Sequence, residues 1–182
     1  MVRMVLRSAA RKGHTQSRAN SMTASSMTSW NSAAAPVHRL VYCSRIHLLA
    51  GEQAADVVID ILKVASLRNR QAKITGALLV CGGWFLQVLE GPLAAINETY
   101  RRIYNDRRNH TLRVIAGPSV AKRLFPEWSM CGRELSATDK SIVDVLEGRR
   151  HFDASLLTEQ SAMRVFGVIR DLQTRDRQLA NQ

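Results

Sequence analysis

Two strand-like runs joined by a glycine turn constrain the fold of this chain more than any other feature. Residues 74–80 read ITGALLV and residues 84–91 read WFLQVLEG, and both are rich in residues that favour β-strands. The Cys81-Gly82-Gly83 stretch between them is a tight-turn signal. The sequence therefore predicts a β-hairpin whose second arm is apolar enough to be a buried strand.

One amide interrupts the second arm of this hairpin. Gln87 has apolar neighbours on both sides, and a buried amide without hydrogen-bond partners costs about 1–3 kcal/mol per group. The Gln87 side chain therefore either faces water or lies beside a group that requires an amide as its hydrogen-bond partner. An amide offers both donors and an acceptor.

The remaining segments alternate between strand and helix. Strand-like runs and apolar spacings of three and four predict three more strands and two helices: strands over 38–45, 111–120 and 127–135, and helices over 52–69 and from Pro92 to about Asn105. The resulting order, βαββαββ, contains a split βαβ pattern. It predicts an α+β ferredoxin-like sandwich, with a mixed sheet and two helices on one of its faces.

The last quarter of the chain is expected to be helical. A short helix is predicted over residues 136–148 and a longer one over about 154–180. The longer helix has an apolar seam at three- and four-residue spacing, formed by Ala162, Val165, Ile169 and Leu172. The seam either covers the exposed face of the sheet or pairs with a second chain. We assign residues 37–134 to the folded domain and 135–182 to a C-terminal helical extension.

Residues 1–36 form a basic segment without hydrophobic periodicity. They hold five Arg and Lys residues and no acid, since the first acidic residue is Glu52, so they supply +5 of the net charge of +11. Such a composition favours a disordered tail. It is also typical of a mitochondrial or chloroplast transit peptide. A third interpretation is that translation begins later, at Met22 or Met27.

Composition argues against several classes of protein. No apolar run approaches the roughly 18 residues that span a bilayer, so we expect a soluble protein of the cytoplasm with no membrane partner. The three cysteines are widely spaced and none belongs to a CxxC pair, which argues against disulfides and against a zinc site. The five histidines show no metal-ligand spacing either.

Strand alternation indicates which side chains accompany Gln87. Alternate residues of a strand share a face, so Gln87 lies between two apolar residues of its own face. On the first strand Tyr42 and Ser44 share a face, and on the last strand Trp128 and Met130 do. If these faces meet the helices, a tyrosine hydroxyl and a glutamine amide lie together in an apolar space. The alternative interpretation is that the hydroxyl and the amide bond only to each other and to the backbone, as an ordinary polar pair of the core.

Five segments that contain these residues resemble, in order and with matching gaps, the successive motifs of the BLUF domains, which are blue-light sensors that use FAD. The segments are VYCS at 41–44, RNRQAKITGALL at 68–79, WFLQVLEGP at 84–92, IYNDRR at 103–108 and FPEWSM at 125–130. The resemblance covers about residues 38–133. The fold that it implies, a ferredoxin-like sandwich, agrees with the fold predicted from the strand and helix pattern.

The resemblance implies a flavin-binding role for the residues around Gln87. The isoalloxazine ring of FAD would lie between the two helices, against the sheet. Gln87 would bond the flavin N5 and C4=O region and also the hydroxyl of Tyr42. Asn69, at the end of the first helix, would bond the C2=O and N3 edge of the ring.

The resemblance also assigns residues around this centre. Trp128 and Met130 match last-strand positions that respond to light, and Ser44 matches a position that tunes the tyrosine–glutamine network. Asp106 and Arg108 lie in the segment near the ribityl and phosphate end of the cofactor, which they would bind.

Two positions depart from the pattern of the family. Arg68 stands where the family often has Asn or His before the flavin-binding asparagine, and Asn109 stands where a His often follows the arginine. Both positions lie toward the edge of the implied pocket, so contacts to the ribityl or phosphate groups are expected to differ there.

The photochemistry that the resemblance implies is a proton-coupled electron transfer. Light would move an electron and a proton from Tyr42 to the flavin. Gln87 would relay the proton and return as a rotated or tautomerised amide, and its new bond to C4=O would give a small red shift. An amide can switch in this way because its donor and acceptor ends can exchange places.

We therefore predict a blue-light photoreceptor, not an enzyme, that signals to an unknown partner protein and forms a homo-oligomer. The residues after 135 are too few for an attached cyclase or phosphodiesterase domain. One alternative is an acylphosphatase-like enzyme, but no paired acid and base is found, and Glu90 is interpreted as part of a strand-to-helix turn. The other is nucleic-acid binding, but the strands lack the paired aromatics of an RNA-recognition motif. Bound flavin separates the first hypothesis from both alternatives.

Overall fold

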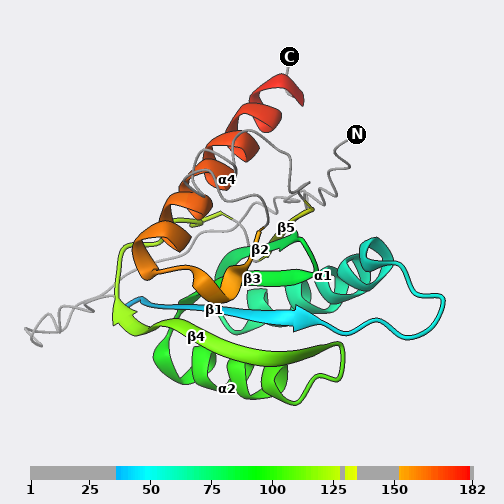
Figure 1. Cartoon of the computed structure of the whole chain (residues 1–182). Helices are drawn as coiled ribbons and strands as arrows, with labels where there is room; N and C mark the ends of the chain where they lie inside the picture. Colours follow the sequence, from blue (N-terminus) through cyan, green and yellow to red (C-terminus); the bar gives the residue numbers. More distant parts are fainter. Residues whose placement is uncertain (1–35, 128–129, 135–151, 181–182) are drawn as a thin grey trace, which may run out of the picture.

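The computed structural model describes residues 36–127, 130–134 and 152–180 (Figure 1). Its elements are, in chain order, β1 (His38–Ile46), α1 (Ala54–Gln71), β2 (Thr75–Cys81), β3 (Trp84–Gly91), α2 (Leu93–Tyr104), β4 (Asn109–Val120), β5 (Cys131–Glu134), the 3-10 helix η1 (Ala154–Leu156) and α4 (Glu159–Ala180). This order confirms the predicted βαββαββ pattern and the long C-terminal helix. The predicted helix over 136–148 lies outside the described residues, as does the segment 1–35.

The five strands form one sheet in the order β4-β1-β3-β2-β5. β1 pairs antiparallel with both β3 and β4, and β2 pairs antiparallel with β3. β5 adds a parallel edge beside β2. The sheet is therefore mixed, and its first four strands have the order that a split βαβ pattern gives.

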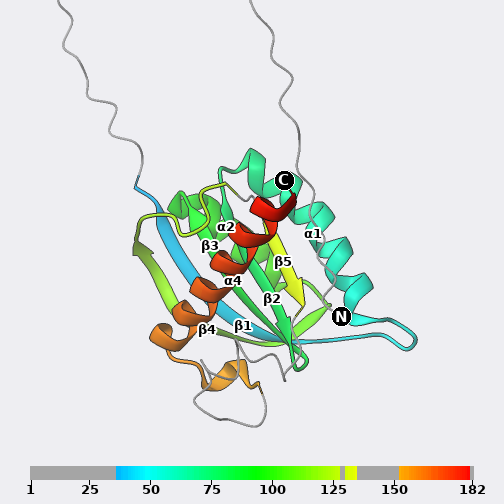
Figure 2. The ribbon, with the colours of Figure 1, turned by 90° about the horizontal axis from the view of Figure 1, so that it is seen from above.

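Helices cover both faces of this sheet (Figures 1 and 2). α1 and α2 lie on one face, where they enclose apolar side chains such as Leu78 and Leu89. η1 and α4 lie on the other face, over a larger apolar cluster that includes Leu79 and Leu86. The seam of α4 therefore covers the sheet, which was one of the two interpretations left open. Its buried members are Ala162, Val165 and Ile169, whereas Leu172 is half-buried.

The predicted hairpin forms the centre of the sheet. Gly82 and Gly83 have φ angles of 58° and 76°, and a two-residue turn with two positive φ angles matches the right-handed twist of the strands that it joins. All eight residues of β3 are buried. Gln87 therefore does not face water, and the first explanation for a polar residue in this strand is wrong.

β4 is an irregular edge strand. Its pairing with β1 has three register shifts, and Thr111, between two of the paired positions, has a φ of 53°. The strand was predicted over residues 111–120, and it runs from Asn109 through Pro118 to Val120. An edge strand tolerates proline because it has no neighbour on its outer side that needs the missing N–H.

Two predicted details of the elements are wrong. The apolar spacing that predicts the first helix starts with Ala55 and continues through Val58 and Leu62, but Ala55 is exposed in the first turn of α1. The last strand was expected from residue 127, but β5 begins at Cys131. Earlier in the chain, the backbone N–H groups of Leu124 and Phe125 donate to the Glu90 side chain and not to a neighbouring strand.

The described residues contain no helix that is long and apolar enough to cross a membrane. Cys43 and Cys81 are free and buried, as is usual for cysteines that pack as small core residues. Within the same ranges, no group of three or more His, Cys, Asp or Glu side chains could hold a metal ion.

Candidate functional site

A cleft lies between α1 and α2, and the sheet forms its floor. The floor residues come from β1, β2 and β3: Tyr42, Ser44, Leu78, Phe85 and Gln87. The α1 wall consists of Ile61, Val64, Ala65, Arg68 and Asn69. The opposite wall consists of α2, the loop after it and the first residue of β4: Thr99, Arg102, Ile103, Asp106, Arg108 and Asn109.

The cleft brings together six of the eight site residues expected from the sequence: Tyr42, Ser44, Asn69, Gln87, Asp106 and Arg108. A seventh, Met130, lies next to Gln87. The eighth, Trp128, lies outside the described residues.

Tyr42 and Gln87 meet on the floor of the cleft. They are buried at 2% and 4% exposure, and the Tyr42 hydroxyl donates a hydrogen bond to Gln87 Oε1. Burial raises the pKa of Tyr42 far above its ordinary value, and nearby Tyr100 and Asp106 add to this effect. The phenol therefore stays protonated at neutral pH and keeps a proton to donate.

The other end of the Gln87 amide is also engaged. Its Nε2 donates to the Met130 Sδ at 3.3 Å, and a thioether sulfur is a weak acceptor that cannot donate. The amide is therefore oriented by a donor on one side and a weak acceptor on the other. The Gln87 amide therefore has a partner at each end, as a polar side chain in a buried strand requires.

Ser44 has a buried hydroxyl that lacks a partner. Its side chain is 1% exposed, and its Oγ is one of three buried polar side-chain atoms among the described residues that make no hydrogen bond. Of the three, it is the one that lines the cleft. Native structures seldom leave such an atom unsatisfied, so this hydroxyl indicates a position for a polar group of a bound ligand.

Asn69 contributes a second buried polar side chain to the cleft. It lies in the last turn of α1 at 2% exposure, as expected from the sequence. Its backbone carbonyl accepts from Ile74 N at 2.7 Å, which fixes the end of the helix. An amide can serve both an acceptor and a donor edge of a ligand.

Asp106 and Arg108 form an ion pair at the mouth of the cleft. Arg108 Nε donates to Asp106 Oδ1 at 2.9 Å, and this bond lowers the pKa of the Asp106 carboxyl and raises the pKa of Arg108. Asn109 Nδ2 donates to the carbonyls of Ile103 and Asp106, each at 3.0 Å. The asparagine that departs from the family pattern therefore holds this loop to the end of α2.

Sequence reasoning missed Thr99 and Arg102. Arg102 Nη2 donates to Thr99 Oγ1 at 2.9 Å, so both side chains lie along one side of α2, three residues apart. With Arg68 and Arg108, Arg102 gives the cleft lining three cationic side chains. A search for polar residues at helical spacing, in place of apolar ones alone, would have found the pair.

The fold is shared with solved structures of other proteins. It is similar to that of BlrB, a BLUF protein in its dark state, with a TM-score of 0.60 and 28% identity over 75% of this chain and 97% of that one. It is also similar to that of BlsA in its photo-activated state, with a TM-score of 0.61 and 24% identity over 71% of this chain and 91% of that one. The comparison defines the class as the α+β sandwich fold of these proteins.

The sequence places the chain within this class. The family model BLUF, described as sensors of blue-light using FAD, matches residues 37–131, which is more than half of the chain. The chain belongs to the BLUF family.

Curated relatives share this region. A photoactivated adenylate cyclase subunit beta of Euglena gracilis is 37% identical over 47% of this chain. The blue light- and temperature-regulated antirepressor BluF of Escherichia coli (strain K12) is 33% identical over 40% of this chain. The matched regions are only 10% and 17% of those two proteins.

The residues of the cleft fit FAD, the cofactor of the family. Leu78 and Phe85 give the floor apolar surface that suits a flat ring, as in other cofactor sites. The unpartnered Ser44 hydroxyl and the Asn69 side chain offer polar groups to the edges of such a ring. Cationic side chains such as Arg102 suit the phosphate groups.

Proposed function

We propose that this chain is a blue-light photoreceptor in which Tyr42 and Gln87 form the photoactive pair and FAD is bound non-covalently between α1 and α2. The observation that carries the proposal is the Gln87 amide, which accepts from the Tyr42 hydroxyl and donates to Met130 within the cleft. A core pair alone would not require that the amide face a cleft lined by an unsatisfied hydroxyl.

The binding residues divide by their position in the cleft. Asn69, buried at the inner end of the α1 wall, would hold the polar edge of the flavin ring. Asp106 and Arg108 would position the ribityl and phosphate end, and their ion pair fixes the Arg108 guanidinium before the cofactor arrives. Preorganisation of this kind reduces the entropy that binding would otherwise cost.

The chemistry of the switch follows from the protonation of Tyr42. When bound, FAD supplies a group that absorbs blue light and then becomes a strong oxidant. Bound FAD would be the oxidant, and Tyr42 would supply the electron from its phenol together with the proton of its hydroxyl. Gln87 Oε1 would receive that proton while Nε2 gives one up to the cofactor, so that atoms and charge balance.

Gln87 can exist in two orientations because of its two neighbours. In the orientation seen here, Oε1 faces the Tyr42 donor and Nε2 faces the Met130 sulfur. A rotated amide would present Nε2 to the phenol oxygen, which can accept, and Oε1 to the sulfur, which cannot donate. The second orientation therefore makes fewer hydrogen bonds and is less stable. This is the property required of a lit state that returns to the first orientation in the dark.

The output is proposed to pass to another protein, and the chain itself is proposed not to be an enzyme. α4 lies on the face of the sheet opposite the cleft, and its Phe166 contacts Phe125, with ring centroids 6.2 Å apart. A change in the sheet can therefore alter the packing of a long helix, which is a two-state element of the required kind. That the chain forms a homo-oligomer stays a prediction.

The first test is an absorption spectrum recorded in dim light before and after a blue flash. The proposal predicts a flavin spectrum that shifts slightly to the red and recovers in darkness. A protein that cannot be loaded with FAD would contradict the binding proposal. Bound flavin without a shift would contradict the roles of Tyr42 and Gln87.

A matched variant separates the switch from the binding site. Gln87→Leu has a similar volume but no donor or acceptor, so it is expected to bind FAD and to lose the red shift. If Gln87→Leu keeps the shift, the amide is not the switching group.

A further inference from the structure

Among the residues whose side-chain burial the structure describes, Glu90 carries the one fully buried carboxylate. Neither the cleft nor the proposed photochemistry uses it. Its side chain is 0% exposed. It points to the face of the sheet opposite Gln87, because residues three apart on a strand face opposite sides. Burial of a carboxylate is costly unless the charge is paired and hydrogen-bonded. Its partners therefore indicate its role.

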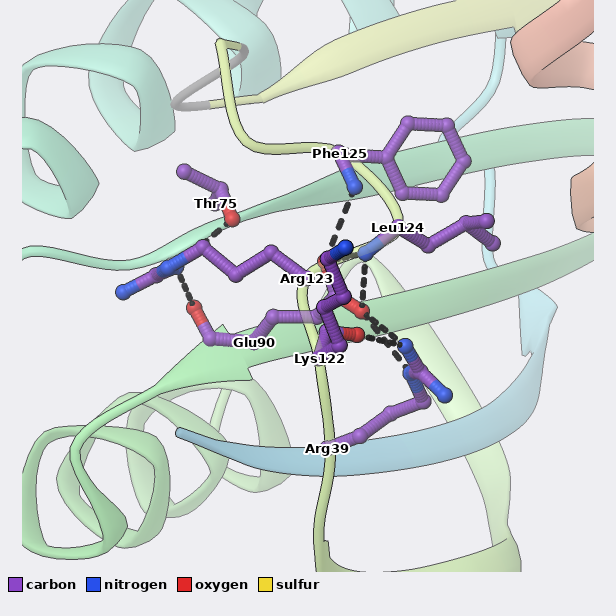
Figure 3. Close-up of polar contacts among 7 residues, drawn as sticks. All are labelled: Arg39, Thr75, Glu90, Lys122, Arg123, Leu124 and Phe125. Carbon is purple, nitrogen blue, oxygen red and sulfur yellow. Dashed lines mark hydrogen bonds and ion pairs between the residues drawn. The ribbon is translucent and has the colours of Figure 1, made fainter. Parts of the chain in front are cut away.

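The Glu90 carboxylate holds the backbone of the segment 121–127, which follows β4 (Figure 3). Its Oε2 accepts from Leu124 N at 2.8 Å and from Phe125 N at 3.0 Å. Its Oε1 accepts from Arg39 Nε at 2.8 Å. These are charge-assisted hydrogen bonds, which are the stronger kind.

Two guanidinium groups extend this attachment. Arg39 of β1 reaches the segment, where its Nη2 donates to the Lys122 carbonyl at 2.5 Å. Arg123 of the segment reaches back to the sheet, where its Nη1 donates to the backbone carbonyl of Glu90 at 2.6 Å and to Thr75 Oγ1 at 2.7 Å. Figure 3 shows both arginines converging on Glu90, Arg39 from β1 and Arg123 from the segment 121–127.

The same stretch of chain reaches the cleft and α4. Met130 lies five residues after Phe125, and its sulfur accepts from Gln87 on the cleft side of the sheet. Phe125 is 0% exposed and packs edge to face against Phe166 of α4. β3 therefore contacts this stretch twice, through Gln87 on one face and through Glu90 on the other.

We propose that Glu90 is a positioning residue: its carboxylate fixes the segment 121–127 to β3 and thereby holds Met130 against the Gln87 amide. The same attachment keeps Phe125 in place under α4. The inference rests on the proposed function only in so far as the Met130 contact sets how fast the lit state relaxes. The attachment itself exists without the cofactor.

The test compares Glu90→Gln with Glu159→Gln, which makes the same chemical change at an exposed position of α4. Glu90→Gln keeps the shape but removes the charge and turns one acceptor into a donor that faces a backbone N–H. Hydrogen exchange at the Leu124 and Phe125 amides should become about tenfold faster, as loss of a bond to a charged group predicts. The methyl resonance of ¹³C-labelled Met130 should also shift, and neither should change in Glu159→Gln.

Two outcomes would overturn the inference, and a third would separate it from the proposed photochemistry. Amides that exchange no faster in Glu90→Gln than in the control would overturn it. Faster exchange with an unmoved Met130 resonance would also overturn it, because Glu90 would then only stabilise the segment. If the wild-type protein shows no red shift, the proposed photochemistry fails, while the exchange and methyl measurements still decide the role of Glu90.

A second variant applies if Glu90→Gln does not fold. Arg39→Lys keeps the positive charge but loses the planar fork that bonds Glu90 and Lys122 together. Exchange at the Leu124 amide should then rise and the Met130 resonance should shift in the same direction with smaller amplitude. An unchanged exchange rate and resonance would contradict the proposal. In the FAD-loaded protein, faster dark recovery of the red shift should accompany either substitution.

Discussion

Tyr42 and Gln87 are direct partners in the antiparallel ladder between β1 and β3, and the hydroxyl of one donates to the amide oxygen of the other. The two central strands of the sheet therefore bring donor and acceptor together without any loop. Because both side chains are buried, the loss of either group leaves its partner without compensation from water.

Tyr42→Phe is expected to destabilise the protein and to abolish the light response. It removes the donor to Gln87 Oε1 and leaves a buried acceptor unsatisfied, which costs about 1–3 kcal/mol of unfolding free energy. Urea titration measures this cost, and flash spectroscopy measures the red shift. Tyr100→Phe is the control, because the Tyr100 ring contacts Tyr42 edge to face at 5.5 Å and its loss of a hydroxyl leaves the pair intact. A red shift retained in Tyr42→Phe would disprove the donor role.

Arg102→Gln is expected to weaken binding of FAD but not of riboflavin. The Arg102 side chain lines the cleft and is about 40% exposed, so it can attract the phosphates that riboflavin lacks. The loss should be about fivefold, as for an exposed ion pair, and it should shrink as salt is added. Arg101→Gln is the neighbouring control outside the cleft lining. An equal loss of affinity for riboflavin would show that Arg102 supports the fold of the cleft instead.

Gly132→Ala is expected to push α1 away from β5. A Cβ at this position would lie 2.2 Å from Leu62 Cδ1, and overpacking of a core typically costs about 1–3 kcal/mol. The unfolding free energy should fall accordingly, and Leu62→Val in the same chain should recover part of it because the clashing methyl is removed.

The control for this substitution is Gly167→Ala. Gly167 lies in α4 with open space where a Cβ would be, so alanine there should stabilise the protein by about 1 kcal/mol through helix propensity. If Leu62→Val brings no recovery in Gly132→Ala, the cost does not arise from the contact with Leu62.

Acid should weaken the protein partly through Asp106. The hydrogen bond from Arg108 lowers the pKa of Asp106, so its stabilising effect is complete above the unfolded-state pKa of about 3.9. That effect is lost as the pH falls through the lower folded-state pKa. Asp106→Asn should therefore show a smaller loss of stability between neutral and acidic pH than the wild type. Asp60→Asn, at an exposed ion pair with Lys63, should behave like the wild type, and identical acid profiles for all three proteins would refute the role of Asp106.

Much of the fold could be predicted because its decisive signals are local. The glycine turn, the alternation along β3 and the spacings in the helices each depend on residues that are near in sequence. The alternation also placed Gln87 on one face and Glu90 on the other. The partner of the α4 seam could not be predicted, because an apolar seam does not specify what it covers.

The candidate site was less predictable where its contacts join distant segments. The Glu90 side chain accepts hydrogen bonds from backbone N–H groups 34 and 35 residues away. Because every residue except proline has a backbone N–H, the residue types at those positions do not reveal the bonds. Glu90 was therefore taken for a turn residue. Ser44 and Asn69 could be assigned only through the resemblance to a family, since no periodicity marks a residue whose partner is a ligand.

The irregularity of β4 also bears on how this protein can associate with others. An exposed sheet edge invites another chain to add a strand, but β4 has three register shifts and contains Pro118, which offers no N–H. Strand addition at this edge is disfavoured, as is the stacking of sheets that leads to fibrils. A partner that docks on this side of the molecule must recognise side chains. Single substitutions in β4 can then change which partner this protein binds without disturbing the sheet.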